Sequence, residues 1–248
     1  MENSWLDSYY EAVAFYYAEP QFLDPMRYPA AKGWKFPEVK KHLQKVEVPL
    51  NHNIAQFFLL APNALRKELF KRLFKEKVGP ALDGDFEMYG CDVDTTFNLQ
   101  NAMQPDFLFM SEAEVVSIEM KIKAKCSIDQ VLKYALLGLA VEIEQNRQKE
   151  HYLVLFGKGD FARQFRGRFE SISKLTDAMA NYDLTSFLLN KPARFREHQE
   201  RLKQIVEKML VEFWTYQRLA EFLDSAKPAT QRSIAGCRGL SKVNLRGY

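Results

Sequence analysis

The chain has 248 residues, of which 47% are hydrophobic and 13% aromatic, so it can form a packed core in one large or two small domains. The formal net charge of +3 is too small to indicate nucleic-acid binding by itself, and the 3 widely spaced cysteines exclude a zinc-finger pattern and suit a reducing compartment. No apolar stretch approaches about twenty residues and the first residues lack the layout of a signal peptide, so we expect a cytoplasmic protein that does not contact a membrane.

We expect the chain to form a single globular domain over residues 1–225, which begins with a helical lobe over residues 1–80. Apolar and aromatic side chains at helical spacing predict helices over 4–18, 54–60 and 65–77. This lobe would lead into the strands that follow.

The helix expected over 65–77 is amphipathic and basic, with six basic and two acidic residues. Its inner face is expected to hold Leu65, Leu69, Leu73 and Phe70 or Phe74. Such a helix can lie along a phosphate backbone, which makes Lys71 and Arg72 candidate substrate-binding residues. The alternative is an ordinary solvated face.

The middle of the chain, residues 81–165, alternates between strand and helix signals. Alternating or apolar runs bounded by turn residues predict strands over 86–99, 106–110, 115–124 and 151–157, the first of them a strand or a hairpin. Residues 128–143 repeat apolar side chains at helical spacing, with Ser127 as the N-cap. The almost wholly apolar run 151–157 is typical of a central strand.

Side chains in the strand over 115–124 alternate between two faces, so Glu119 and Lys121 share one face and Met120 points to the other. The preceding strand is adjacent and antiparallel, and it opens with Asp106. We therefore expect the side-chain tips of Asp106, Glu119 and Lys121 to converge within about 4 to 7 Å, the span that one hydrated Mg²⁺ requires.

These residue types suit the cleavage of a phosphodiester. Asp106 and Glu119 could hold Mg²⁺, or Mn²⁺ in its place, against a substrate phosphate, with the backbone carbonyl of Met120 as a third ligand. Lys121 could orient or deprotonate a metal-bound water and neutralise charge on the phosphate. The alternative is that Asp106 is a turn residue, and that Glu119 and Lys121 form a solvated surface ion pair of little energetic value.

Gln130 and Tyr134 lie four residues apart on the helix over 128–143, on the side opposite its main apolar face. Their side of the helix is not simply solvent-facing, because other apolar residues flank them. One interpretation places them beside the metal as substrate-binding residues. The other makes Tyr134 a packed core aromatic with Gln130 as its hydrogen-bond partner.

The C-terminal part of the chain is expected to be a helical addition over residues 166–225, with helices over 166–190 and 196–224. Residues 226–248 contain five basic and no acidic residues together with three glycines. We expect this basic tail to be mobile and available to a substrate or partner.

In order and spacing, Pro105-Asp106 and Glu119-Met120-Lys121 resemble the signature of the PD-(D/E)xK nuclease superfamily. Gln130 and Tyr134 match the Gln-x-x-x-Tyr element of its RecB-like branch, where that element contacts the substrate near the metal. The resemblance covers about residues 85–160. It implies an α/β fold with a restriction-endonuclease-like core, a mixed central sheet flanked by helices, to which this chain adds helices at both ends.

The resemblance further implies a metal-dependent nuclease that acts on nucleic acid, with DNA favoured over RNA. Lys123, in the expected strand over 115–124 and on the same face as Glu119 and Lys121, is a further substrate-binding candidate. Many members of the superfamily carry another acid or a histidine on a preceding helix, for which Glu68, Glu76 and His52 are the candidates. The alternatives are a catalytically inactive nuclease fold that serves as a nucleic-acid-binding or assembly module, and a purely structural helical scaffold. A homo-oligomer or a protein partner stays open.

Overall fold

The structure is a computed structural model that describes residues 54, 57–58, 61–75, 82–89, 93–100, 102–103, 105–121 and 126–225. The chain divides into two compact units, residues 61–219 and residues 1–60 with 220–248, and the first unit contains nearly all of the described residues. The helix predicted over 4–18 and the basic tail predicted over 226–248 lie outside the described residues. Within the described ranges, no helix combines the length and apolar character needed to span a bilayer.

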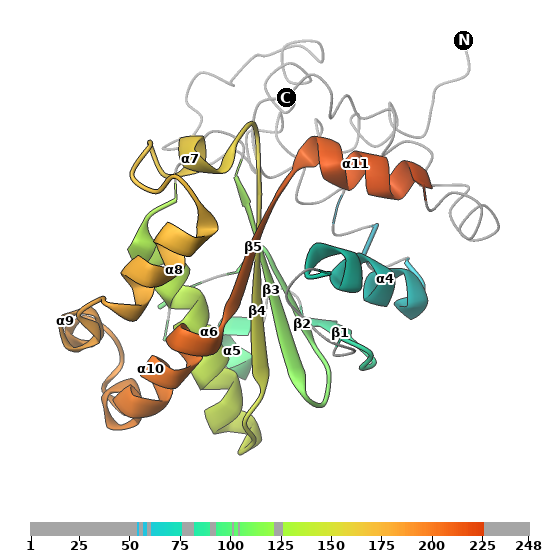
Figure 1. Ribbon diagram of the computed structural model, residues 1–248. Helices are drawn as coiled ribbons and strands as arrows, with labels where there is room; N and C mark the ends of the chain where they lie inside the picture. Colours follow the sequence, from blue (N-terminus) through green and yellow to red (C-terminus); the bar gives the residue numbers. More distant parts are fainter. Residues whose placement is uncertain are drawn as a thin grey trace, which may run out of the picture. The chain divides into compact units, whose positions relative to one another are not determined.

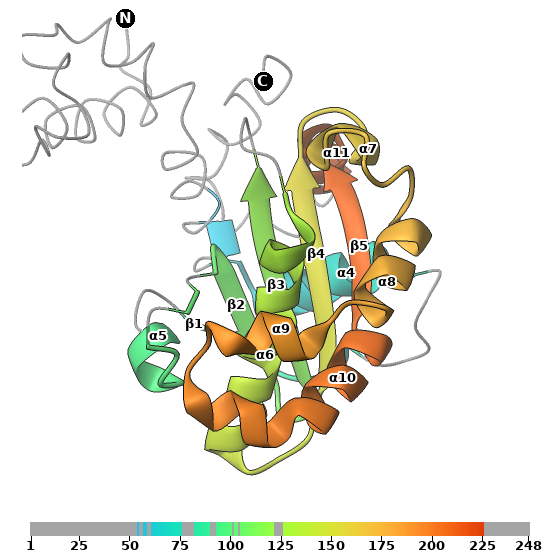
Figure 2. The same cartoon turned by 90° about the vertical axis from the view of Figure 1, so that its left-hand side faces the viewer.

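A five-stranded mixed sheet forms the centre of the unit 61–219, in the order β1-β2-β3-β4-β5 (Figure 2). The strands are β1 (Glu87–Tyr89), β2 (Phe107–Met110), β3 (Glu114–Lys121), β4 (Glu150–Gly157) and β5 (Leu210–Thr215). The first three form an antiparallel meander, whereas β4 runs parallel to β3 and β5 parallel to β4. The chain is therefore an α/β protein with a mixed sheet flanked by helices, as predicted.

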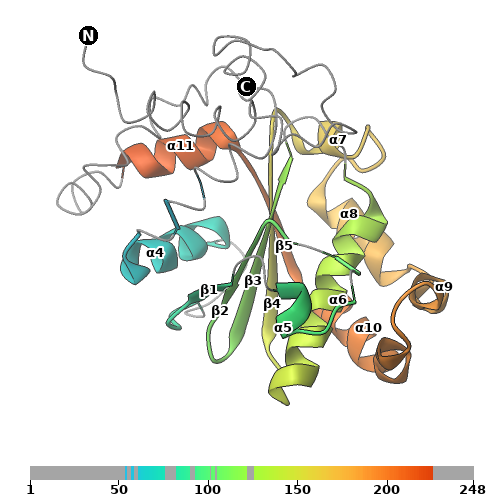
Figure 3. The same cartoon turned by 180° about the vertical axis from the view of Figure 1, so that it is seen from behind.

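Helices cover both faces of this sheet (Figures 1 and 3). The helices are α4 (Asn63–Leu73), α5 (Val93–Thr96), α6 (Ile128–Gln145), α7 (Phe161–Gln164), α8 (Ile172–Ala180), α9 (Leu184–Leu189), the 3-10 helix η2 (Ala193–His198), α10 (Gln199–Lys208) and α11 (Tyr216–Ser225). One face packs against α4 and is called the α4 face. The other, the α6 face, packs against α6, α8 and α10, and α9 lies beyond them.

Aromatic residues dominate the core of the α4 face. The ring of Phe70 on α4 meets those of Phe86 and Phe109 edge-on, at centroid distances of 5.0 and 5.2 Å, and Phe74 meets Tyr152 of β4 at 5.0 Å. The apolar residues predicted for the inner side of this helix, Leu65, Leu69, Leu73, Phe70 and Phe74, are all buried. The amphipathic pattern thus correctly predicts which side of α4 faces the sheet.

α6 connects β3 to the parallel β4 and buries most of its surface. The side chain of Ser127 accepts a hydrogen bond from the backbone N–H of Gln130 at 3.2 Å, which confirms the predicted N-cap. Near its middle, Gly138 lies against His151 of β4, because a Cβ at Gly138 would come within 2.5 Å of the imidazole Nδ1. This close approach lets the helix lie directly on the sheet.

Three expectations about elements were wrong. The region 86–99 holds the short strand β1 and then the helix α5, whose Val93 is buried in the core. The helix expected over 166–190 is two helices, because the side chain of Asp183 accepts a hydrogen bond from Ser186 N–H and starts α9 anew. The helix expected over 196–224 is interrupted by β5, which packs Val211 and Trp214 beside β4.

Candidate active site

Glu119 of β3 is a buried carboxylate near the C-terminal end of the strand. Only 4% of its surface is exposed. Its Oε1 forms an ion pair with Lys121 Nζ and accepts a hydrogen bond from Gln130 Nε2, and its Oε2 accepts one from the Tyr134 hydroxyl. Three side chains from β3 and α6 therefore donate to one carboxylate.

Asp106 lies beside this carboxylate, one residue before β2. In the β2–β3 ladder Phe107 is opposite Ile118, so the alternation of the strands places Asp106 across from Glu119 on the α6 face. Asp106 Oδ2 accepts a hydrogen bond of 2.7 Å from the backbone N–H of Met120. The side chain of Met120 itself is buried on the α4 face, so only its backbone belongs to this site.

Tyr134 stays a neutral donor in this arrangement. Burial raises the pKa of its phenol, and the negative charge of Glu119, the hydrogen bond to Glu119 and the charge of Asp106 raise that pKa further. Tyr134 is a packed core aromatic, as one of the two interpretations expected, but Gln130 is not its hydrogen-bond partner, because both side chains donate to Glu119. Nor is the Glu119–Lys121 pair solvated, since only 12% of the Lys121 side chain is exposed.

The local sequence explains why these groups meet. Glu119 and Lys121 share a strand face by alternation, and the β3–α6–β4 crossover returns α6 across that face. Because Gln130 and Tyr134 are one helical turn apart, both point from the first turns of α6 toward the end of β3. Asp106, Glu119, Lys121, Gln130 and Tyr134 are thus brought together in space.

Two of the predicted substrate-binding residues, Lys71 and Arg72, are not part of this cluster. Lys71 and Arg72 are exposed on α4, which packs on the opposite face of the sheet, and Lys71 is ion-paired with Asp83. Glu68 is also on α4 and exposed. Lys123 lies outside the described residues, as do Glu76 and His52.

The cluster offers a divalent metal two carboxylates. Within the described ranges, no three His, Cys, Asp or Glu side chains gather closely enough to hold a metal ion together. Mg²⁺ nevertheless needs only one or two carboxylates when substrate phosphates and water complete its shell. A carboxylate has about four lone-pair positions, and donors occupy three of those of Glu119, so about one remains for a metal. Asp106 and Glu119 therefore fit Mg²⁺ or Mn²⁺ and do not fit a zinc site, which needs at least three protein ligands.

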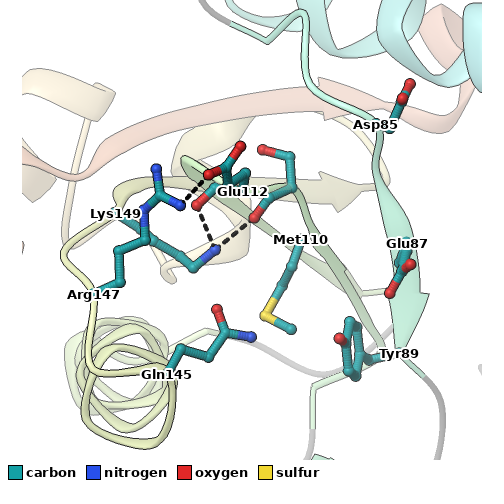
Figure 4. A pocket seen from close by; sticks show the side chains of 9 residues that line it. Asp85, Glu87, Tyr89, Met110, Glu112, Gln145, Arg147 and Lys149 are labelled. Atoms are coloured by element: carbon teal, nitrogen blue, oxygen red, sulfur yellow. Dashed lines mark hydrogen bonds and ion pairs between the residues drawn. The ribbon is translucent and has the colours of Figure 1, made fainter.

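A cavity of about 390 Å³ lies at the other end of the sheet, where β3 begins (Figure 4). Lys149 on one wall donates to the backbone carbonyls of Ser111 and Glu112 at 2.5 and 2.9 Å, while Asp85 and Glu87 lie on the opposite wall. Lys149 thus ties the β2–β3 turn to the start of β4. The cavity is separate from the Glu119 cluster.

Gln164 of α7 belongs to the surroundings of the cluster and was not anticipated. It is 3% exposed and lies over Gly157, where an added Cβ would meet its Cδ at 2.6 Å. Gly157 is the β4 partner of Lys121, so Gln164 sits next to the candidate catalytic lysine on the same sheet face. The four-residue spacing of Phe161, Phe165 and Phe169 was the available signal that this segment folds back onto the sheet.

Comparisons of the chain with protein-family models, with curated proteins and with solved structures found no match.

Proposed function

We propose that this chain is a metal-dependent phosphodiesterase that cuts nucleic acid, with DNA as the favoured substrate. Asp106 and Glu119 would hold Mg²⁺ or Mn²⁺, and Lys121 would act on the attacking water and the phosphate. The order α4, β1–β3, α6, β4 is also that of a restriction-endonuclease-like core, which agrees with the resemblance of the motif. A fold alone does not define a function, so the proposal depends on the cluster around Glu119.

The observation that carries the proposal is the burial of Glu119 together with Lys121. Removing charges from water costs several kcal/mol per ion unless partners offset it. A structural ion pair at the exposed edge of the sheet would avoid this cost. Here the pair lies at the carboxyl end of a central strand, with Asp106 beside it, and substrates of α/β proteins usually bind near that end.

Each residue then has a distinct role. Lys121, whose ammonium is paired with Glu119, is placed to orient a water and to offset negative charge that develops on the phosphate. Gln130 and Tyr134 hold the Glu119 carboxylate in one orientation, and the Met120 N–H does the same for Asp106. When bound, a divalent ion would lower the pKa of a coordinated water and supply positive charge to the phosphate.

The test is a cleavage panel of labelled DNA and RNA, single- and double-stranded, with EDTA, Mg²⁺ or Mn²⁺. Lys121→Ala should lose cleavage by at least about 100-fold, because the charge that stabilises the transition state is removed. Lys121→Ala should keep the rise in thermal midpoint that Mn²⁺ gives the wild type. Asp106→Ala should lose both cleavage and this rise in thermal midpoint. At ten times the Kd, that rise corresponds to about 1.4 kcal/mol of stabilisation.

Two control variants match these substitutions. Lys203→Ala removes an exposed lysine of α10, and Glu87→Gln removes an exposed carboxylate of β1, a strand of the same sheet. Both should cleave like the wild type. Equal cleavage by the wild type and Lys121→Ala would refute the catalytic role, and metal-dependent stabilisation without any cleavage would favour a binding module.

A further inference from the structure

The segment that follows β4, residues 158–168, lies next to the Glu119 cluster. Gly157 ends β4 and is the ladder partner of Lys121, so the chain leaves the sheet directly beside the candidate catalytic lysine. Figure 2 shows α7 of this segment at the end of the sheet to which β3 and β4 point. The backbone carbonyl of Gln164 also accepts a hydrogen bond of 2.8 Å from Cys126 N–H, just before α6 begins.

Buried residues fix this segment in place. Gln164 Nε2 donates to the carbonyl of Lys158 at 2.6 Å, which closes the loop on itself. The ring of Phe161 meets Phe165 at 5.1 Å and Phe213 of β5 at 5.7 Å, and Phe165 meets Phe169 at 5.4 Å. The segment therefore presents its remaining side chains from a rigid base.

Those remaining side chains are basic. Lys158, Arg163, Arg166 and Arg168 are all exposed, and Asp160 is the only acid between positions 158 and 168. The carboxylate of Asp160 is used locally, because it accepts a hydrogen bond of 2.8 Å from Arg163 N–H as the N-cap of α7. Four basic and one acidic residue leave a local charge of +3.

No acid neutralises these four cations within the part of the chain that the structure describes. Several basic side chains elsewhere have carboxylate partners: Lys67 pairs with Asp85, Arg194 with Glu144, and Arg201 with Glu142. Those pairs tie elements together. The four cations of the segment 158–168 instead face solvent, and Arg168 only lies over the Phe169 ring at 5.6 Å.

We propose that residues 158–168 bind the phosphodiester backbone of the nucleic acid and lead it to the Glu119 cluster. The inference rests on the proposed function, because that function requires the bound nucleic acid to reach the Glu119 cluster. It differs from the sequence-based expectation that Lys71 and Arg72 of α4 bind the substrate. Exposed cations on a rigid support contact phosphates without reading bases, so binding is sequence-independent and strongly salt-dependent.

The test measures the binding of fluorescein-labelled DNA and RNA of one sequence by anisotropy in EDTA, between 50 and 200 mM salt. Each phosphate contact contributes about 0.9 to the slope of log K against log salt. Arg163→Gln/Arg166→Gln should reduce the slope by about 2 and raise the Kd at least about tenfold. The control, Lys203→Gln/Lys208→Gln, removes the same charge from exposed positions of α10 and should change neither.

A reduced slope for both DNA and RNA supports backbone binding by the segment, while equal effects of the two double variants on slope and Kd overturn it. Heparin binding is measured beside it, because a loss of affinity confined to heparin would show that the segment does not bind nucleic acid and would also overturn the inference. Failure of the proposed function is distinguishable: a wild type that never cleaves but binds DNA through Arg163 and Arg166 keeps the inference. If the wild type cleaves but Arg163→Gln/Arg166→Gln leaves the slope of log K against log salt unchanged, the proposed function stands and the inference about the segment 158–168 fails.

Discussion

At the scale of single residues, the candidate active site is built around one carboxylate, that of Glu119. Glu119 is buried, and Lys121, Gln130 and Tyr134 all donate to its carboxylate. The loss of one partner of a buried charged group costs more than the loss of a hydrogen bond at the surface. Of the three donors only Lys121 is charged, and Tyr134→Phe removes a single donating hydroxyl while the ring stays in place.

Tyr134→Phe should lower the free energy of unfolding by about 1–3 kcal/mol, because Glu119 stays buried with one donor fewer. Tyr152→Phe is the matched control, since its hydroxyl donates at 2.7 Å to Glu150, which is exposed. That variant should lose less than about 1 kcal/mol. Urea unfolding of both variants in EDTA checks the comparison, and an equal loss for the two would contradict the role given to Tyr134.

At the scale of elements, the segment 158–168 depends on the contact between Gly157 and Gln164. Gly157→Ala places a Cβ within 2.6 Å of the Gln164 side chain, which therefore has to move and to give up its hydrogen bond to Lys158. We expect a loss of about 1–3 kcal/mol in unfolding free energy. Faster hydrogen exchange of the Cys126 amide should accompany it, because that amide donates to Gln164.

Gly157→Ala/Gln164→Ala is the control for this steric argument. It removes the side chain that blocks the new methyl group, so it should be more stable than Gly157→Ala alone. Hydrogen-exchange mass spectrometry together with urea unfolding measures both effects. Full wild-type stability of Gly157→Ala would show that the contact does not fix the segment.

The elements that the sequence predicted well are those whose own periodicity decides their structure. β3 alternates between Glu119 and Met120, and α6 repeats its apolar residues after a Ser127 cap. β5 was missed because Leu210–Thr215 follows a helix and becomes a strand by packing beside β4, a contact that local pattern does not contain. For the same reason the sequence grouped Asp106, Glu119, Lys121, Gln130 and Tyr134 but did not anticipate Gln164, which reaches the site through a tertiary contact.

At the scale of the whole unit 61–219, a second buried carboxylate joins separate elements. Glu142 of α6 accepts hydrogen bonds from Arg201 of α10 at 2.7 Å, from Lys149 N–H at 2.8 Å and from His151 Nε2 of β4 at 2.8 Å. Burial alone would raise the pKa of Glu142, but these hydrogen bonds outweigh it and lower that pKa to about 2.

A folded-state pKa below the ordinary value of 4.5 means that ionised Glu142 stabilises the fold. This contribution, at most about 3 kcal/mol, is fully present above about pH 4.5 and is lost as the pH falls toward 2. Glu142→Gln should therefore be clearly destabilised at pH 7, and its deficit against the wild type should shrink below pH 4.

Glu144→Gln is the control on the same helix, because the ion pair that Glu144 forms with Arg194 is partly open to solvent. Its unfolding free energy should change by less than about 1 kcal/mol and depend little on pH. Urea titrations of the three proteins at pH 7, 4.5 and 3 provide the measurement. A pH-independent deficit of Glu142→Gln would contradict the ionic contribution.

The position of β3 at the middle of the sheet also matters during synthesis. Seven of its eight residues are buried in the folded protein, and its partner β4 is translated only after the whole of α6. At about 5–20 residues per second, the edge of β3 stays unpaired on that side for a few seconds. Unpaired apolar edges invite pairing with other chains, and charged residues near their ends oppose it. We therefore expect Glu119 and Lys121 to oppose such pairing in the nascent chain before β4 is made.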